Sequence, residues 1–332
     1  MNFEPQKFET YDNASLIESK LYLYSPGILK ILLQDRTTGE NIFWASDSYS
    51  EKGPEFAPDQ PLKVELIKQR KKDLIKPRVL KSPEDQAART KGKAEVFTPA
   101  RIVNKMINYI DEEWFGRKGV FNTETEMSWI TNESKIEFPK EKNWKDYVKE
   151  TKLEITCGEA PFLVSRYDAV TGEIIPVKDR VGMLDRKFRV INENVENERV
   201  WIRMAYIALR AIYGYEFQGD NLIIARENIL FTFIENMVYK FGHGPTIKQM
   251  QVAAEIISWN IWQMDGLTKC VPYKKAPKIY EQITLNFGDD LGWTANAEIQ
   301  EESEEGRYCL IADWENMKGT KPKIIEFRSI EG

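Results

Sequence analysis

Histidine and cysteine are scarce in this chain of 332 residues. Its single histidine, His243, lies in the glycine-flanked loop FGHGP, and its three cysteines have no zinc-like spacing. The sequence therefore argues against a metal site built from these residues, and we expect no metal. Cys157 has no neighbouring histidine that would activate its thiol, so we expect a small buried side chain there. His243 is expected to be a loop or capping residue.

The chain also lacks long apolar runs and an excess of positive charge. No uncharged apolar run is long enough to span a bilayer, and the N-terminus has no basic region followed by an apolar stretch. We therefore expect a cytoplasmic protein with no membrane partner. The net charge of −5 and the pI of about 5.4 argue against a strongly basic nucleic-acid binder, although a local basic patch can still contact DNA.

The composition is that of a globular protein, with 42% hydrophobic and 30% charged residues. Residues 1–62 are predicted to form a β-rich N-terminal region, with strands at 20–24, 28–35 and 41–49 and a turn between the last two. Residues 63–94 are predicted to form a basic linker or helical segment. Its lysines and arginines are either a solvated surface or a set of phosphate contacts.

Residues 95–332 form the third and largest region. Its apolar periodicity predicts, in chain order, an extended stretch and then a helix from Pro99 within 95–115, hairpin 168–181, helix 199–212, strand 212–217, helix 221–241, helix 246–265 and strands 307–314 and 323–330. The alternation up to residue 267 favours a parallel α/β sheet with flanking helices. Thr98 is expected to cap the first helix. The apolar face of that helix is expected to contain Ile102, Met106, Ile107 and Ile110.

The stretch KLEITCGEAPFLVSRY, residues 152–167, predicts a small-molecule site. It indicates a short buried strand, a turn at Cys157-Gly158 and a helix that begins at Ala160-Pro161. The backbone of a glycine turn can approach a ligand closely, and the first N–H groups of a helix point at such a ligand.

Residues elsewhere in the chain complete this predicted site. Glu216 ends the next predicted strand, where a carboxylate can accept hydrogen bonds from the two hydroxyls of a ribose. Asp265 follows the last predicted helix and can accept a hydrogen bond from an adenine amino group. Ligands of an open parallel sheet bind outside the carboxyl ends of its strands, so we expect these acids to meet Thr98 and Gly158 there.

These motifs resemble those of S-adenosylmethionine-dependent DNA adenine methyltransferases, in particular the methylase subunits of restriction–modification systems. EVFTP is similar to the family's F-T-P stretch, LEITCGEAPFL to its D-P-x-C-G-x-G-x-F-L motif, IYGYEF to its G-x-E strand end and NIWQMDGL to its adenine-contacting segment. The resemblance covers most of the chain. It implies a Rossmann-like class I methyltransferase fold that binds S-adenosylmethionine and DNA. The cofactor-binding residues that it implies are Phe97, Thr98, Glu154, Thr156, Cys157, Gly158, Glu159, Phe162, Glu216, Phe217, Asp265 and Leu267.

The sequence departs from the family pattern in three places. Glu154 stands where the family has aspartate. Ala160 and Pro161 replace the second glycine and its small neighbour, so Ala160 is expected to place a Cβ near the ligand. The family's catalytic motif is N/D-P-P followed by an aromatic residue, which grips the target amine and stacks on a flipped base. This chain has no Pro-Pro pair, and VPY (271–273) has a valine where a hydrogen-bonding side chain is required, so the catalytic residues are unknown.

Two functions follow from these observations. The first is the cofactor-binding subunit of a DNA adenine methyltransferase, with the catalytic motif supplied by a partner chain that docks at the closing strands, residues 307–330. The alternative is a catalytically inactive methyltransferase-like module that binds DNA or another protein. A second basic cluster, in the hairpin region, is either a solvated loop or a DNA contact. It contains Arg180, Arg186, Lys187 and Arg189.

Overall fold

The computed structural model describes residues 26–69, 74–93, 95–281, 298–318 and 321–330. At their centre is a three-stranded parallel sheet with the order β3-β4-β5. Its strands are β3 (Lys152–Glu154), β4 (Ile212–Glu216) and β5 (Ile261–Gln263). Helices connect the successive strands, which is the kind of crossover that parallel pairing requires. The prediction of a parallel α/β sheet with flanking helices is therefore confirmed.

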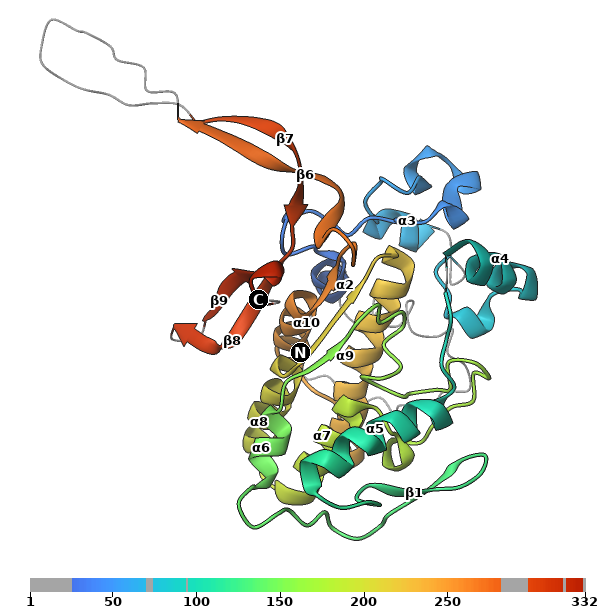
Figure 1. Cartoon of the computed structure of the whole chain (residues 1–332), viewed down its shortest axis with the longest axis vertical. Coiled ribbons are helices and arrows are strands. Elements are labelled where there is room, and N and C mark those ends of the chain that lie inside the picture. Colours follow the sequence, from blue (N-terminus) through green and yellow to red (C-terminus); the bar gives the residue numbers. More distant parts are fainter. Residues whose placement is uncertain (1–25, 70–73, 94, 282–297, 319–320, 331–332) are drawn as a thin grey trace, which may run out of the picture.

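Four helices make these connections: α7 (Met183–Asn194), α8 (Glu198–Arg210), α9 (Gly219–Phe241) and α10 (Ile247–Asn260). They form a bundle beside the sheet (Figure 1). α9 is buried along most of its length, and its buried side chains include polar groups such as Asp220, Arg226 and Asn228 as well as apolar ones. It ends as predicted at Gly242, which adopts a φ of 77°. The predicted helix 246–265 is too long, because its last residues form β5.

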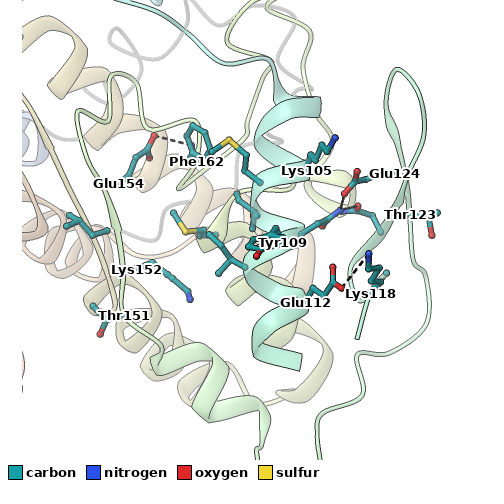
Figure 2. A pocket seen from close by; sticks show the side chains of 18 of the residues that line it. Lys105, Tyr109, Glu112, Lys118, Thr123, Glu124, Thr151, Lys152, Glu154 and Phe162 are labelled. Carbon is teal, nitrogen blue, oxygen red and sulfur yellow. Dashed lines mark hydrogen bonds and ion pairs between the residues drawn. The ribbon is translucent and has the colours of Figure 1, made fainter. Parts of the chain in front are cut away.

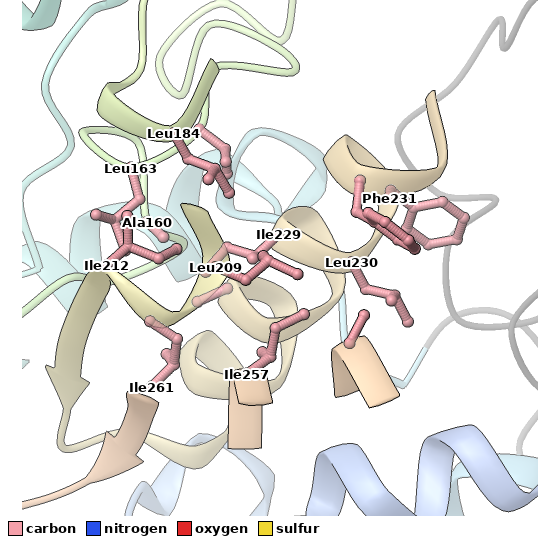
Figure 3. Packing of buried hydrophobic residues seen from close by; sticks show 14 of the residues in the cluster. Ala160, Leu163, Leu184, Leu209, Ile212, Ile229, Leu230, Phe231, Ile257 and Ile261 are labelled. Carbon is pink, nitrogen blue, oxygen red and sulfur yellow. The ribbon is translucent and has the colours of Figure 1, made fainter. Parts of the chain in front are cut away.

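The two faces of the sheet pack against different groups of side chains. Ile212 and Ile261 belong to a large apolar cluster that includes residues of all four helices (Figure 3). Tyr215 and Trp262 point to the other face and join a smaller cluster with residues of the C-terminal strands. This arrangement follows from the alternation of side chains along a strand.

The N-terminal region is not β-rich in the residues that the structure describes. Most of the predicted strand at 28–35 lies in helix α2 (Pro26–Leu33). Its apolar run ILKILL is compatible with either element, and packing against α10 favours the helix. The turn that follows is present, but residues 41–49 form only isolated bridges before a short 3-10 helix. The predicted strand at 20–24 lies outside the described residues.

The basic segment is partly helical, as predicted, with α3 (Val64–Gln69) and α4 (Pro83–Lys93). Two of its cations are buried in an ion cluster. Arg89 binds Glu95 at 2.6 Å and Asp220 at 2.9 Å, and Lys81 binds Asp220 at 3.1 Å. Asp220 lies in the first turn of α9, where the helix dipole also favours negative charge. These two cations are therefore not free for phosphate, and residues 70–73 lie outside the described part of the chain.

Helix α5 (Ala100–Phe115) was predicted, but its cap was not, and of its expected apolar face only Ile107 is fully buried. The Ala100 N–H donates to the Asp168 carboxylate at 2.7 Å, whereas Pro99 occupies the cap position and Thr98 makes no capping bond. Met106 is 52% exposed and Ile110 is 38% exposed. The face that packs inward instead carries Val103, Ile107 and polar groups that bond to α7.

The remaining elements lie at the edges of this body. β1 (Asn122–Glu124) and β2 (Trp129–Thr131) form a short hairpin, and α6 (Trp144–Lys149) precedes β3. β6 (Cys270–Glu281) pairs with β7 (Glu298–Tyr308), and β8 (Leu310–Lys318) pairs with β9 (Lys321–Glu326). β6 and β7 project away from the body (Figure 1). Among the described helices, none is long and apolar enough to cross a membrane.

Candidate functional site

The stretch from Lys152 to Tyr167 begins in β3 and continues past its carboxyl end. The predicted turn is present: Gly158 has a φ of 55°, in the left-handed region that favours glycine. Cys157 is 2% exposed, which confirms the expected buried side chain. The predicted helix at Ala160-Pro161 is wrong, because this segment forms only turns and the next α-helix begins at Met183. No helix N-terminus therefore points at a ligand here.

The side chain of Glu154 stabilises this segment, because it accepts backbone N–H groups that lie beyond the turn. Its Oε1 accepts the Phe162 N–H at 3.2 Å, and its Oε2 accepts the Leu163 N–H at 3.1 Å. Burial raises the pKa of Glu154 to about 8, against the effect of these two bonds and with a further contribution from Glu216. The strand that carries Glu154 is not buried as predicted, because Leu153 is 43% exposed.

Ala160 has a φ of 64°, an unfavourable value for a residue with a Cβ. The residue is 0% exposed and belongs to the large apolar cluster with Leu163 and Ile212 (Figure 3). Its methyl group is therefore part of the core. We had expected this Cβ on the ligand side of the turn.

Glu216 ends β4 and bonds directly to the glycine turn. Its Oε2 accepts the Gly158 N–H at 2.9 Å, and its Oε1 accepts the Gln218 N–H at 3.0 Å. The residue is 7% exposed, and burial raises its pKa. Each carboxylate oxygen still has a second lone pair. The buried Oε1 of Gln218 has no hydrogen-bond partner among the described residues, so acceptors for additional donors are present beside Glu216.

Asp265 follows β5, the third strand of the sheet. The preceding Met264 N–H donates to the Glu216 carbonyl oxygen at 3.1 Å, which fixes Asp265 close to the end of β4. Its Oδ1 accepts the N–H groups of Leu267 at 2.8 Å and Thr268 at 3.3 Å. An acidic residue therefore stands at or just after the carboxyl end of each of the three parallel strands.

An aromatic ring packs on the glycine turn. A Cβ built at Gly158 would lie 3.5 Å from ring atoms of Phe97, at ordinary van der Waals distance, so the ring packs directly over the turn. The Arg78 guanidinium lies 5.4 Å from the centroid of the same ring, a cation–π contact. The roles of Arg78 and Asp168 have no local signature in the sequence, because both residues contact partners that are distant in the chain. Thr98, next to Phe97, is partly buried.

The other predicted site residues contribute no side-chain hydrogen bond to this group, although the N–H groups of Phe162 and Leu267 donate to Glu154 and Asp265. Glu159 bonds instead to the Arg78 N–H and to the Tyr167 hydroxyl, both at 2.6 Å. Leu267 is 94% exposed, Phe217 is 37% exposed and Thr156 is exposed. Phe162 contributes its N–H to Glu154.

The second basic cluster is not a solvated loop. Arg186 and Lys187 lie on α7 and are each 1% exposed. The Lys187 ammonium donates to three main-chain carbonyl oxygens, and Arg186 pairs with Asp111. Arg180 pairs with Glu235 at 2.7 Å. These cations hold the fold together and are not available to DNA.

No family model, curated protein or solved structure matches this chain. The geometry of the site is therefore the basis for an assignment of function.

Proposed function

We propose that the chain binds S-adenosylmethionine at the carboxyl edge of the β3-β4-β5 sheet. In this proposal it is the cofactor-binding subunit of a DNA adenine methyltransferase, and a partner chain supplies the catalytic motif. One observation carries the proposal: Glu154, Glu216 and Asp265 follow three adjacent parallel strands around the turn at Gly158. Ligands of open parallel sheets bind at this edge. A Rossmann-like class I methyltransferase fold is part of the same proposal.

The residues of the edge fit this cofactor. Glu216 would accept the two ribose hydroxyls through the lone pairs that its backbone donors leave free. Asp265 would accept the adenine amino group, and Phe97 would form an apolar wall beside the glycine turn. Glu154 would act indirectly, because both of its oxygens already hold the turn. When bound, the cofactor supplies a methyl group on a sulfonium centre.

The alternative function is a methyltransferase-like module that binds DNA or another protein without the cofactor. The backbone contacts of Glu216 favour it, since both oxygens accept main-chain N–H groups and the residue is only 7% exposed. The role of holding these backbone N–H groups is therefore enough to explain why a carboxylate is present at this position. The absence of a Pro-Pro pair is common to both functions.

Calorimetric titration of the full chain with S-adenosylmethionine separates the two functions. We expect saturable binding that Glu216→Ala weakens by about tenfold or more, a loss of at least about 1.4 kcal/mol. Glu216→Gln keeps the side-chain shape and is expected to weaken binding as well. Glu126→Ala removes an exposed carboxylate in the β1–β2 loop and is the matched control, with unchanged affinity expected.

Circular dichroism establishes whether each variant is folded. The absence of saturable heat with the folded wild-type chain would refute cofactor binding and support the module. Equal affinity for the wild-type chain and Glu216→Gln would refute the role given to Glu216.

A further inference from the structure

Two cavities beside β3 differ in how their charged groups are paired. Figure 2 shows the first, a cavity of about 1190 Å³ between β3 and α5. Its Lys118 lies 3.6 Å from Glu112, and its Lys152 lies 3.7 Å from Glu150. Lys105 on its rim is exposed. Among the described residues that line this first cavity, no buried charge lacks a partner, so its charges do not indicate a ligand.

The second cavity, of about 840 Å³, lies between the sheet and the β8–β9 hairpin. Its lining includes Thr151 and Ala211, which directly precede β3 and β4. The cavity therefore reaches the amino edge of the sheet, whereas the turn at Gly158 lies at the carboxyl edge. Its volume falls within the roughly 300–1,000 Å³ that is typical of small-molecule sites.

The walls of the second cavity are mainly apolar and include two aromatic rings that hydrogen bonds hold in place. The Tyr213 hydroxyl donates to the Ala312 carbonyl oxygen at 2.9 Å. The Trp314 indole N–H donates to the side-chain oxygen of Asn260 at 2.7 Å. Both residues are partly buried, and Ile330 adds apolar surface at the rim. Rings fixed in this way offer flat surfaces to an aromatic or branched apolar ligand.

Arg210, the last residue of α8, gives this cavity a cation without an acid partner. Its Nη1 lies 3.9 Å from the Met317 sulfur, and its guanidinium carbon lies 4.9 Å from the centroid of the Trp314 ring. Its Nε is buried without a hydrogen-bond partner, and no carboxylate among the described residues pairs with the guanidinium.

The surroundings of Arg210 favour a bound anion. Burial lowers the pKa of Arg210, and Tyr206 opposes this effect. An arginine stays charged in a protein, and a desolvated charge costs free energy when no opposite charge pairs with it. The contact with the Trp314 ring offsets part of this cost. A carboxylate in the cavity would offset more, because it can accept two parallel hydrogen bonds from a guanidinium.

The other charges of the lining favour an anion with a single negative charge. The cations of the lining are Lys149 and Arg210, and its acids are Asp313 and Glu315. Asp313 already accepts the N–H groups of Glu315 at 3.0 Å and Asn316 at 3.1 Å, and Glu315 is exposed. Because the cations and the acids are equal in number, a doubly charged phosphate would meet more repulsion than a carboxylate.

We propose that the cavity between the sheet and the β8–β9 hairpin binds a small monocarboxylate with an aromatic or branched apolar body. Arg210 binds the carboxylate, and the rings of Tyr213 and Trp314 contact the body. This site does not rest on the proposed function, because it lies at the opposite edge of the sheet from Gly158.

Calorimetric titration of the full chain with 3-phenylpropionate tests the ligand class. We expect saturable binding. The uncharged 3-phenylpropanamide has nearly the same shape and is expected to bind about tenfold more weakly or worse, because it brings no negative charge to Arg210. The doubly charged 2-phenylethyl phosphate is also expected to bind more weakly than the acid. Equal affinities for the acid and the amide, tighter binding of the phosphate, or no saturable binding of the acid would each overturn the proposal.

Arg210→Gln tests the residue that binds the carboxylate. We expect this change to weaken binding of the acid by about tenfold or more and to leave binding of the amide within about twofold, because the acid alone loses an ionic partner. Equal loss for both probes would show that Arg210 has only a structural role, and unchanged binding of the acid would also overturn the proposal. Arg203→Gln, at an exposed position of the same helix, is the matched control with unchanged affinities.

A pair of variants at the rim tests the site without changing Arg210. Ile330 is 53% exposed, so its replacement leaves the core intact, and circular dichroism establishes that each variant is folded. Ile330→Asp is expected to bind the acid about threefold more weakly than Ile330→Asn does, because the added carboxylate repels it. Equal affinities of these two variants would overturn the proposal.

The carboxyl edge provides the last control. Glu216→Ala is expected to leave the affinity for 3-phenylpropionate unchanged. Loss of that affinity would place the probe at the proposed cofactor site and overturn the separate cavity. Binding of 3-phenylpropionate without binding of S-adenosylmethionine would refute the proposed function alone.

Discussion

Exchanging glycine and alanine within one turn tests where the Ala160 methyl group lies. Ala160 has a φ of 64° and is 0% exposed, whereas Gly158 has a φ of 55° and lies against Phe97. Both residues have left-handed backbones, but a methyl group at each position meets different surroundings. Ala160→Gly removes a methyl from the core, and Gly158→Ala adds one against the Phe97 ring, which lines the proposed site.

Three contributions set the change in unfolding free energy for Ala160→Gly. Glycine relieves roughly 1–2 kcal/mol of left-handed strain. Loss of the buried methyl costs about 0.8 kcal/mol, and the greater freedom of glycine in the unfolded chain costs roughly 0.4–1 kcal/mol. These contributions nearly cancel, so we expect a net change below about 1 kcal/mol. Gly158→Ala introduces the strain and is expected to destabilise by roughly 1 kcal/mol.

Urea unfolding measures these stabilities, and calorimetry measures the affinity for S-adenosylmethionine. Ala160→Gly is expected to leave the affinity within about twofold, and Gly158→Ala is expected to weaken it by about tenfold. A tenfold tighter complex with Ala160→Gly would refute the reasoning, because it would mean that the methyl obstructs the ligand. Destabilisation of Ala160→Gly by more than about 2 kcal/mol would show that relief of strain does not offset the lost methyl.

Two further predictions concern stability. Burial alone raises the pKa of Glu235, but the Arg166 and Arg180 guanidinium groups outweigh it and lower that pKa from 4.5 to about 2. The stability that Glu235 contributes is therefore present above about pH 4.5 and is lost as the pH falls toward 2. Urea unfolding over this pH interval should show that the wild-type chain loses up to about 3 kcal/mol more free energy of unfolding than Glu235→Gln does. Parallel curves of unfolding free energy against pH for the two chains would contradict this. Gly219→Ala should destabilise by roughly 3 kcal/mol, because its methyl would overlap a main-chain carbonyl oxygen. Gly92→Ala, with open space around it, should stabilise by roughly 0.5–1 kcal/mol, and equal urea midpoints for these two variants would contradict the reasoning.

The parts of the fold with local signals were predictable from the sequence. The apolar residues of α8 recur with a helical period, and β4 is a short apolar run. α9 ends at a glycine that adopts a left-handed backbone conformation. The acids Glu216 and Asp265 were identified because each follows an apolar segment. Their proximity is a consequence of parallel pairing, which the alternation of elements already indicated.

The parts that depend on distant contacts were not predictable. Arg186 looks like a surface residue in the sequence, and its burial is explained by its bonds to Asp111, Asn104 and Asn108 on α5. The boundary between α10 and β5 has no turn residue. It is set by Asn260, whose side-chain amide donates to three carbonyl oxygens around the start of β4. The cap of α5 comes from Asp168, far along the chain.

The ion cluster at the start of α9 limits how this chain can be divided for experiments. Asp220 is 0% exposed, and two of its partners, Lys81 and Arg89, belong to the basic segment that precedes residue 95. A fragment beginning at residue 95 would leave the carboxylate buried without either cation. Removing one partner of a buried ion pair costs about 3–5 kcal/mol, which is a large part of the stability of a typical domain. The compositional boundary between these regions is therefore a poor place to cut, and the smallest useful fragment must retain Lys81 and α4.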